Sequence, residues 1–155
     1  FKPFNDVYGY AKGDLMLKHL AQIICDVCQQ SECFVGHIGG DDFVILFTRD
    51  DHVELCEQIL NEYHEQSLSF FHEEHLEAEG YHAFSRNGDK KFFPLVSLAI
   101  GVISPDVNRC FSPLEISAMA ADAKTEAKKL DGKSIFICRR KTHKTANDWL
   151  LEDSA

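Results

Sequence analysis

Several features that mark other protein classes are missing from this sequence. No apolar run comes near the roughly 18 residues that span a membrane, and no basic segment followed by an apolar one marks a secretion signal. Basic residues are scarce, since 16 Lys and Arg stand against 25 Asp and Glu, for a net charge of −9. This balance argues against contact with nucleic acid or a membrane. A phosphate-binding site would need a local basic patch or a metal.

The six cysteines lack the pattern of a structural zinc site. Cys25 and Cys28 form a CxxC, but no second pair follows. The pair also comes late in a helical pattern, whereas a thioredoxin-type motif begins a helix. We interpret all six as reduced, mostly buried thiols of a cytoplasmic protein.

The chain has enough residues for one domain with a core of its own, at 155 residues and 45% hydrophobic content. It begins with Phe1 rather than Met, and we therefore expect it to be part of a longer protein.

A β-hairpin is predicted where two apolar, β-prone runs flank Gly39-Gly40. Glycine tolerates the positive φ of a tight turn and lets a ligand approach the backbone closely. Asp41 and Asp42 follow at once, and two adjacent carboxylates suit a hard cation with oxygen ligands. From the spacing alone, a metal site and a solvated polar turn are equally good interpretations.

Helical patterns precede and follow this hairpin. Pro3 argues against a regular helix in residues 1–6, and Asp14 is a good N-cap for a helix with apolar residues at Leu17, Leu20, Ile24 and Val27. Asp50-Asp51 predicts the start of a second long helix, whose apolar inner side holds Val53, Leu55, Cys56, Ile59, Leu60 and Tyr63. Residues 62–79 hold several His and Glu, but their spacing is not HExxH, and a solvated charged segment is the better interpretation.

The second half predicts strands around one more helix. Asn87-Gly88 predicts a hairpin between residues 81–84 and 92–94. The apolar run 95–103 predicts a central strand, and Ser112-Pro113 with Glu115 begins a helix that ends near Gly132. Residues 134–138 form a last strand. The order α-β-β-α-β-β-α-β, with hairpins, predicts an α+β fold whose mainly antiparallel sheet has helices packed on it.

Five motifs occur together in the order and spacing of one family, and each is read directly from the sequence: Phe1–Asp6 (FKPFND), Tyr8–Asp14 (YGYAKGD), Gly39–Phe43 (GGDDF), Ser97–Val102 (SLAIGV) and Ala127–Lys133 (AKKLDGK). Over nearly all of residues 1–140 they resemble the GGDEF domain, the catalytic domain of diguanylate cyclases. The resemblance implies a nucleotide-cyclase-like α/β fold with a central five-stranded sheet, whose first strand is missing here. It leaves residues 141–155 as a C-terminal tail or linker.

The activity that the resemblance implies is the condensation of two GTP into cyclic di-GMP, with release of pyrophosphate and with Mg²⁺ or Mn²⁺, in bacterial signal transduction. Each 3′-hydroxyl attacks the α-phosphate of the opposing GTP, so the active form would be a homodimer. The Phe-Lys-Pro-Phe-Asn-Asp and Pro-Leu-Val-Ser-Leu variants also resemble GGDEF domains attached to phosphodiesterase (EAL) and CBS regions. Attached sensory domains would be a further kind of partner.

The resemblance also implies roles for individual residues. Asp41 would bind the metal and help to deprotonate the 3′-hydroxyl, with Asp42 beside it, while Lys2 would stabilise the transition-state charge. Asn5 and Asp14 would read guanine, since a carboxylate can accept from N1–H and the 2-amino group together. The other implied substrate contacts are Phe1, Tyr10, Gly39, Gly40, Lys129 and Lys133, with the two lysines on the last helical turn.

Simpler interpretations stay open for several of these residues. Asp14 is also a plain helix N-cap, and Asn5 also suits a turn. Lys129 and Lys133 are also ordinary surface lysines.

The sequence departs from the family pattern at several positions. The family's other metal-binding Asp lies on the strand that would precede Phe1, and we expect the parent protein to carry it. Asp42 replaces the usual Glu, Lys133 the usual Arg, and Tyr10 a common His. The family's Arg-x-x-Asp product-inhibition motif falls on residues 30–33, which read Gln-Ser-Glu-Cys, so feedback inhibition there is not expected.

Three hypotheses follow. The leading one is a diguanylate cyclase domain that is active in the full-length protein. The second is a degenerate GGDEF domain that binds GTP or a partner and regulates an attached domain without catalysis. The third is a non-enzymatic α/β interaction module, against which the retained Lys2, Asn5, Asp14, Asp41 and Lys129 argue.

Overall fold

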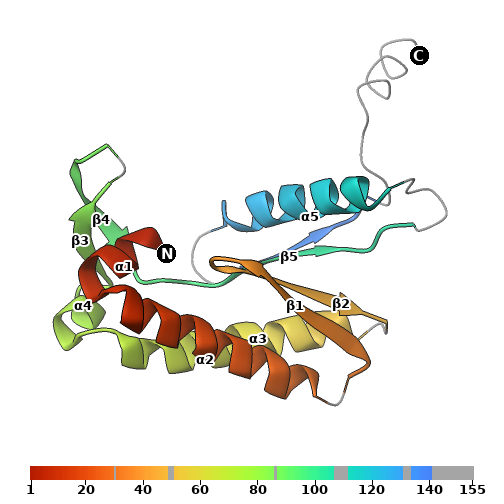
Figure 1. Cartoon of the computed structure of the whole chain (residues 1–155), viewed down its shortest axis with the longest axis horizontal. Coiled ribbons are helices and arrows are strands. Elements are labelled where there is room, and N and C mark those ends of the chain that lie inside the picture. The colour runs from red at the N-terminus through yellow and green to blue at the C-terminus, as the bar shows by residue number, and fades with distance from the viewer. Residues whose placement is uncertain (30, 49–50, 86, 107–111, 131–133, 141–155) are drawn as a thin grey trace, which may run out of the picture. The chain divides into compact units, whose positions relative to one another are not determined.

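A computed structural model describes residues 1–29, 31–48, 51–85, 87–106, 112–130 and 134–140. It has the mixture of helices and strands that the sequence predicts (Figure 1). The chain divides into two compact units, Phe1–Leu98 and Ala99–Ala155, and each is described here by itself. The described strands form three two-stranded sheets, so the five-stranded sheet stays a prediction.

The first helix, α1 (Lys2–Tyr8), corrects the expectation for the start of the chain. Pro3 lies in the first turn of α1, where the missing N–H of proline has no intrahelical partner to lose. Gly9, with φ 85°, separates α1 from α2 (Tyr10–Cys28). Asp14 therefore lies inside α2, and its interpretation as an N-cap is wrong.

The core of the first unit is built around the aromatic face of α1. Phe4 is fully buried. Its ring is stacked on the ring of Tyr8, with centroids 4.6 Å apart, and lies nearly perpendicular to the ring of Phe71, with centroids 5.4 Å apart. Tyr81 also packs against Tyr8 and Phe71. These contacts join α1 to segments that lie more than 60 residues away in the sequence.

The two long helices of this unit, α2 and α3 (His52–Ser67), lie side by side (Figure 1). The predicted apolar faces are confirmed, because the buried residues recur at helical spacing. On α2 they include Met16, Leu20, Ile23, Ile24 and Val27, and on α3 they include Cys56, Ile59, Leu60 and Tyr63. Asp51 is the N-cap residue of α3, and Asp50 lies outside the described residues.

Both predicted hairpins are confirmed. Strands β1 (Cys33–Gly39) and β2 (Asp42–Phe47) pair antiparallel, as do β3 (Gly80–Phe84) and β4 (Lys90–Pro94). Gly88 takes φ 83° in the turn between β3 and β4. The charged segment before β3 forms the short helices η1 (Leu68–Phe70) and α4 (Glu73–Glu77).

In the second unit, strand β5 (Ala99–Ile103), helix α5 (Pro113–Ala127) and strand β6 (Ser134–Cys138) form a β-α-β arrangement with parallel strands. Residues 95–98 are not part of β5, so this strand is shorter than predicted. Ser112 is the expected N-cap of α5, and together with Glu115 it forms a capping box. The helix ends at Ala127 rather than near Gly132, and a turn follows it.

Of the six cysteines, five lie in the described residues and are free thiols: Cys25, Cys28, Cys33, Cys56 and Cys138. Only Cys28 and Cys56 among them are buried, and Cys25 is exposed, so the expectation of mostly buried thiols is met only in part. Cys110 lies outside the described residues, as does the tail 141–155. No helix in the part that the structure describes has both the length and the apolar character to cross a membrane.

Gly101 provides a test of the packing between β5 and α5. A Cβ at this position would lie 2.4 Å from the Lys124 nitrogen and 2.6 Å from the Ala123 carbonyl carbon. Backbone atoms cannot rotate away, so Gly101→Ala should destabilise this unit by about 2 kcal/mol. Hydrogen exchange of the Val102 and Ala123 amides measures the loss, and Ile137→Ala, on a half-exposed side chain of β6, serves as the control. Unchanged protection in Gly101→Ala would contradict the packing.

The first unit should lose stability at alkaline pH through Tyr63. Burial raises the pKa of this phenol from 10 to about 12, so the folded state holds a proton that the unfolded state releases. The stabilisation is complete below pH 10 and is lost as the pH rises toward 12, at up to about 1.4 kcal/mol per pH unit. Urea unfolding at several pH values should give a shallower decline for Tyr63→Phe. Tyr10→Phe, at a side chain that is 71% exposed, should keep the slope of the unsubstituted chain, and equal slopes for all three proteins would refute the assignment.

Candidate functional site

The tip of the β1–β2 hairpin has a backbone that requires glycine. Gly39 and Gly40 take φ values of 143° and 58°, and the strand register shifts between His37 and Gly39. His37 steadies the turn, because its Nε2 lies 3.0 Å from the Gly40 oxygen and its ring stacks on Phe43 with centroids 4.7 Å apart. The glycines therefore form a shaped turn that can lie close to a ligand.

The two carboxylates differ in their positions on this turn. Asp41 is exposed at the tip, and Asp42 is the first residue of β2 and is half-buried. Both offer the hard oxygen donors that Mg²⁺ prefers, and Mg²⁺ usually takes one or two carboxylates together with water and substrate phosphates. The residues present thus fit such an ion. Among the described residues, the groups with three ligand atoms close together include neither aspartate.

A second candidate position lies where α1 packs on α2. The Asn5 Oδ1 atom is buried and has no hydrogen-bond partner. It lies against Gly13, since a Cβ on Gly13 would be only 1.9 Å from it. The adjacent residue, Asp14, has an exposed side chain. A buried acceptor without a donor costs about 1–3 kcal/mol, so a donor that the Asn5 side chain could rotate to meet would relieve this cost.

The other predicted residues of the first unit are close to the start of α1 or α2. Phe1 is the N-cap residue of α1, and its carbonyl accepts from the amides of Phe4 and Asn5 at 3.0 and 3.3 Å. Lys2 is exposed at the first position of α1, and Tyr10 is 71% exposed at the first position of α2. Each of these side chains is therefore accessible to a ligand or half-buried.

Lys129 lies in the second unit and is described only within it. It follows α5 in a turn rather than on the last helical turn, and its Nζ forms an ion pair with Glu126 at 2.6 Å. This pair is exposed and contributes little to stability, so a phosphate could replace Glu126 as the partner. Lys133 lies outside the described residues.

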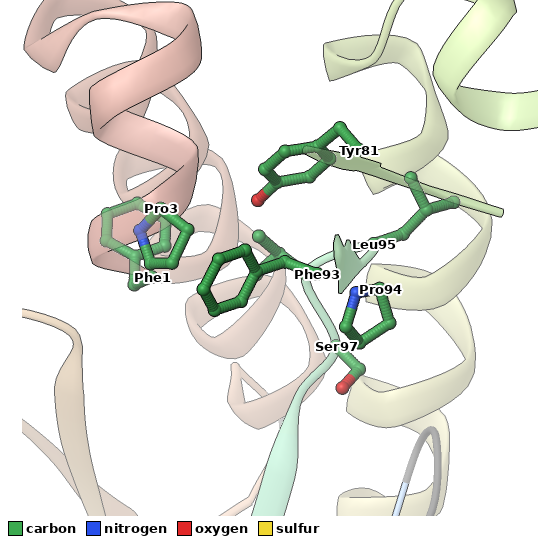
Figure 2. Close-up of a pocket in the computed structure, with 8 residues that line it drawn as sticks. Phe1, Pro3, Tyr81, Phe93, Pro94, Leu95 and Ser97 are labelled. Carbon is green, nitrogen blue, oxygen red and sulfur yellow. The ribbon is translucent and has the colours of Figure 1, made fainter. Parts of the chain in front are cut away.

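A pocket of about 220 Å³ lies beside Phe1 (Figure 2). Its walls are mostly apolar: Phe1, Pro3, Tyr81, Phe93, Pro94, Leu95, Val96 and Ser97. Burial, followed by the charge of Tyr8, raises the pKa of Tyr81 to about 12, so its hydroxyl stays neutral near pH 7. At about 220 Å³ the pocket lies below the roughly 300–1,000 Å³ of typical ligand pockets.

Among the predicted residues of the first unit, Gly39–Asp42 thus form the hairpin turn, and Asn5 and Asp14 form a corner beside Gly13. Phe1, Lys2 and Tyr10 belong to neither group and lie at the starts of α1 and α2. Sequence reasoning missed a third group, in which the Tyr8 hydroxyl meets His75. The histidines of residues 62–79 were a signal for it. Their sequence spacing did not indicate that a tyrosine 67 residues away would lie against them.

Comparison with known proteins supports the same family that the motifs indicate. The family model described as diguanylate cyclase, GGDEF domain, matches residues 1–90, which is more than half of the chain. This match includes both groups of the first unit and ends before Lys129. No solved structure matches the chain significantly.

Three curated relatives carry related names. A diguanylate cyclase of Vibrio cholerae is 36% identical over 80 residues, which are 49% of this chain and 24% of that protein. The diguanylate cyclase DgcS of Shewanella oneidensis is 38% identical over 64 residues, 39% of this chain and 21% of its own length.

Diguanylate cyclase A of Treponema denticola is 29% identical over 73 residues, 45% of this chain and 19% of that protein. The chain thus spans a quarter or less of these relatives. The family match, the Gly39–Asp42 turn and the Asn5–Asp14 corner lead to one conclusion: this chain belongs to the GGDEF-domain family of diguanylate cyclases.

Proposed function

We propose that this domain binds GTP and, in the natural protein at its full length, condenses two GTP into cyclic di-GMP. The observation that carries the proposal is the buried Asn5 Oδ1 without a partner, held against Gly13 beside Asp14. Guanine carries donors at N1 and at the 2-amino group, and Asn5 and Asp14 supply acceptors for them. Adenine lacks this donor pair, so the corner would favour GTP over ATP.

The chain's residues would divide the chemistry between them. Asp41 would accept the proton of the 3′-hydroxyl while the oxygen of that hydroxyl bonds to the α-phosphorus of the opposing GTP. The bond from that phosphorus to the oxygen bridging to the β-phosphate breaks, and pyrophosphate leaves. The 3′-hydroxyl of the opposing nucleotide then attacks the α-phosphorus of the first one in the same way, which releases a second pyrophosphate and closes the ring. Lys2 would stabilise the charge that develops at phosphorus.

Other residues would bind and orient the substrate. Gly39 and Gly40 would let phosphates approach the backbone, with the Phe1 amide, Lys129 and Lys133 as further phosphate contacts and Tyr10 as a base or ribose contact. Mg²⁺ or Mn²⁺ held by Asp41 and Asp42 would neutralise charge on the phosphate oxygens. Because each half-site holds one GTP, the active form would be a homodimer. We propose a cytoplasmic location, where GTP is available, and attached sensory, EAL or CBS domains in the natural protein.

One observation favours the alternative, a degenerate domain that binds GTP or a partner and regulates an attached domain without catalysis. Asp42 stands where the resemblance places the family's usual Glu, and its side chain is one methylene shorter. Such a change can shift metal geometry enough to lower the rate strongly. GTP binding without turnover would therefore identify the alternative.

The guanine assignment predicts a change in affinity. Asp14→Ala should weaken GTP binding by roughly 10- to 100-fold, since hydrogen bonds to a charged group contribute about 1.5–3 kcal/mol. Gly13→Ala should also weaken it, because the added Cβ displaces the Asn5 side chain. Titration calorimetry with GTP and ATP measures both effects. Asp6→Asn, at an exposed side chain of α1, is the matched control, and equal affinity for GTP and ATP in the unsubstituted chain would count against the assignment.

The catalytic assignment predicts the effect of substitutions at the hairpin tip. In the natural protein at full length, with GTP and Mg²⁺, Asp41→Asn should lower cyclic di-GMP formation more than 100-fold and leave the fold intact. Asp42→Glu restores the family's longer carboxylate and should raise the rate. Asp89→Asn, at the exposed turn of the other hairpin, should have no effect. Product formation that survives Asp41→Asn would be evidence against this role.

A further inference from the structure

A group of metal-binding side chains lies at α4, apart in sequence from every residue of the proposed GTP site. His72, Glu74 and His75 each offer a ligand atom, and these atoms all lie within 4.8 Å of one another. The His75 Nε2 faces the Glu74 Oε1 at 3.8 Å. The two imidazole rings are stacked, with centroids 5.7 Å apart and planes 24° from parallel.

Tyr8 holds this group in position from α1. Its hydroxyl is hydrogen-bonded to the His75 Nδ1 and accepts from the His72 backbone N–H at 3.2 Å. Burial raises the pKa of the Tyr8 phenol, as does the nearby Glu74 charge, against the hydrogen bond from His72. One side chain thus orients both ends of the segment 72–75.

Metal binding through Nε2 requires one of the two proton arrangements that fit the contact between Tyr8 and His75. When the ring proton is on Nδ1, His75 donates it to the Tyr8 oxygen, and the Nε2 lone pair points toward the Glu74 carboxylate. Metal-binding histidines commonly donate their other ring N–H to such a partner, which fixes the ring and raises its basicity. The His75 side chain is only 20% exposed, whereas Glu74 is 77% exposed, so one ligand is held firmly and another can move.

We propose that His72, Glu74 and His75 form a binding site for a late first-row divalent cation, with Zn²⁺ as the best match. Two imidazoles and one carboxylate are a common zinc donor set, and the fourth position would be taken by water. Ligand atoms around tetrahedral zinc are roughly 3.3 Å apart, as follows from Zn–N and Zn–O bonds of about 2 Å. The ligand atoms already lie within 4.8 Å of one another, and rotation of the exposed His72 and Glu74 side chains would bring them to this spacing around a bound ion.

The donor set distinguishes this site from the Gly39–Asp42 turn. Hard oxygen ligands suit Mg²⁺, whereas imidazole nitrogens favour Zn²⁺ and its neighbours. A bound ion would link α4 to α1 through Tyr8, and α1 is the helix that carries Lys2 and Asn5. The inference does not depend on the proposed function, because every ligand and its positioning residue are named from contacts within the first unit.

The test is a titration of the full 155-residue chain with Co²⁺, followed by displacement with Zn²⁺. We expect one equivalent to bind, with visible d–d absorption and without the thiolate-to-cobalt charge-transfer band that cysteine ligands would give. The bound metal should also raise the midpoint of thermal unfolding by about 5 °C. A spectrum dominated by thiolate charge transfer, or no binding, would overturn the proposal.

Substitutions identify the ligands. His72→Ala and Glu74→Gln should each weaken binding at least tenfold, and both change exposed side chains, so folding should be unaffected. Tyr8→Phe should weaken binding by about 10- to 100-fold through the lost hydrogen bond to His75, with circular dichroism to verify the fold. His64→Ala and Glu73→Gln are the matched controls, and both side chains are exposed. Asp41→Asn should leave this site unchanged. Full affinity in His72→Ala would refute the site.

Discussion

The position of α1 depends on the burial of Phe4. Its fully buried ring packs on Tyr8 and Phe71, and Tyr81 completes the cluster. Burying an aromatic side chain of this size contributes about 2–3 kcal/mol, which a seven-residue helix needs because isolated helices of that length are not stable in water. The burial of Phe4 thus fixes the helix that carries Asn5 and Tyr8.

Two different groups on α1 are positioned as a result. The residue after Phe4 is Asn5, whose Oδ1 is pressed against Gly13. One turn later comes Tyr8, whose hydroxyl meets His75 and the His72 amide. A single short helix therefore connects the corner proposed for guanine with the group proposed for zinc. Any change in how α1 packs would alter both together.

The hairpin tip was the feature most open to two interpretations from sequence. Its positive φ values at Gly39 and Gly40 and the exposed Asp41 are compatible with a solvated turn as well as with a metal site. The family match over residues 1–90 favours the second interpretation. Asp42 stands where the resemblance places the family's usual Glu, and it offers a carboxylate that is one methylene shorter.

Local patterns in the sequence determined the two hairpins, the apolar faces of α2 and α3 and the N-cap of α5, because each depends on neighbours within a few residues. The family followed from the order and spacing of five such motifs along the chain. Only the tertiary structure decided that Pro3 lies in the first turn of a helix, that Asp14 lies inside α2 and that Asn5 is buried on Gly13. The same is true of the group around Tyr8, whose partners are 64 and 67 residues away. Contacts at that separation arise from packing around Phe4, and no periodicity or spacing along the chain records them.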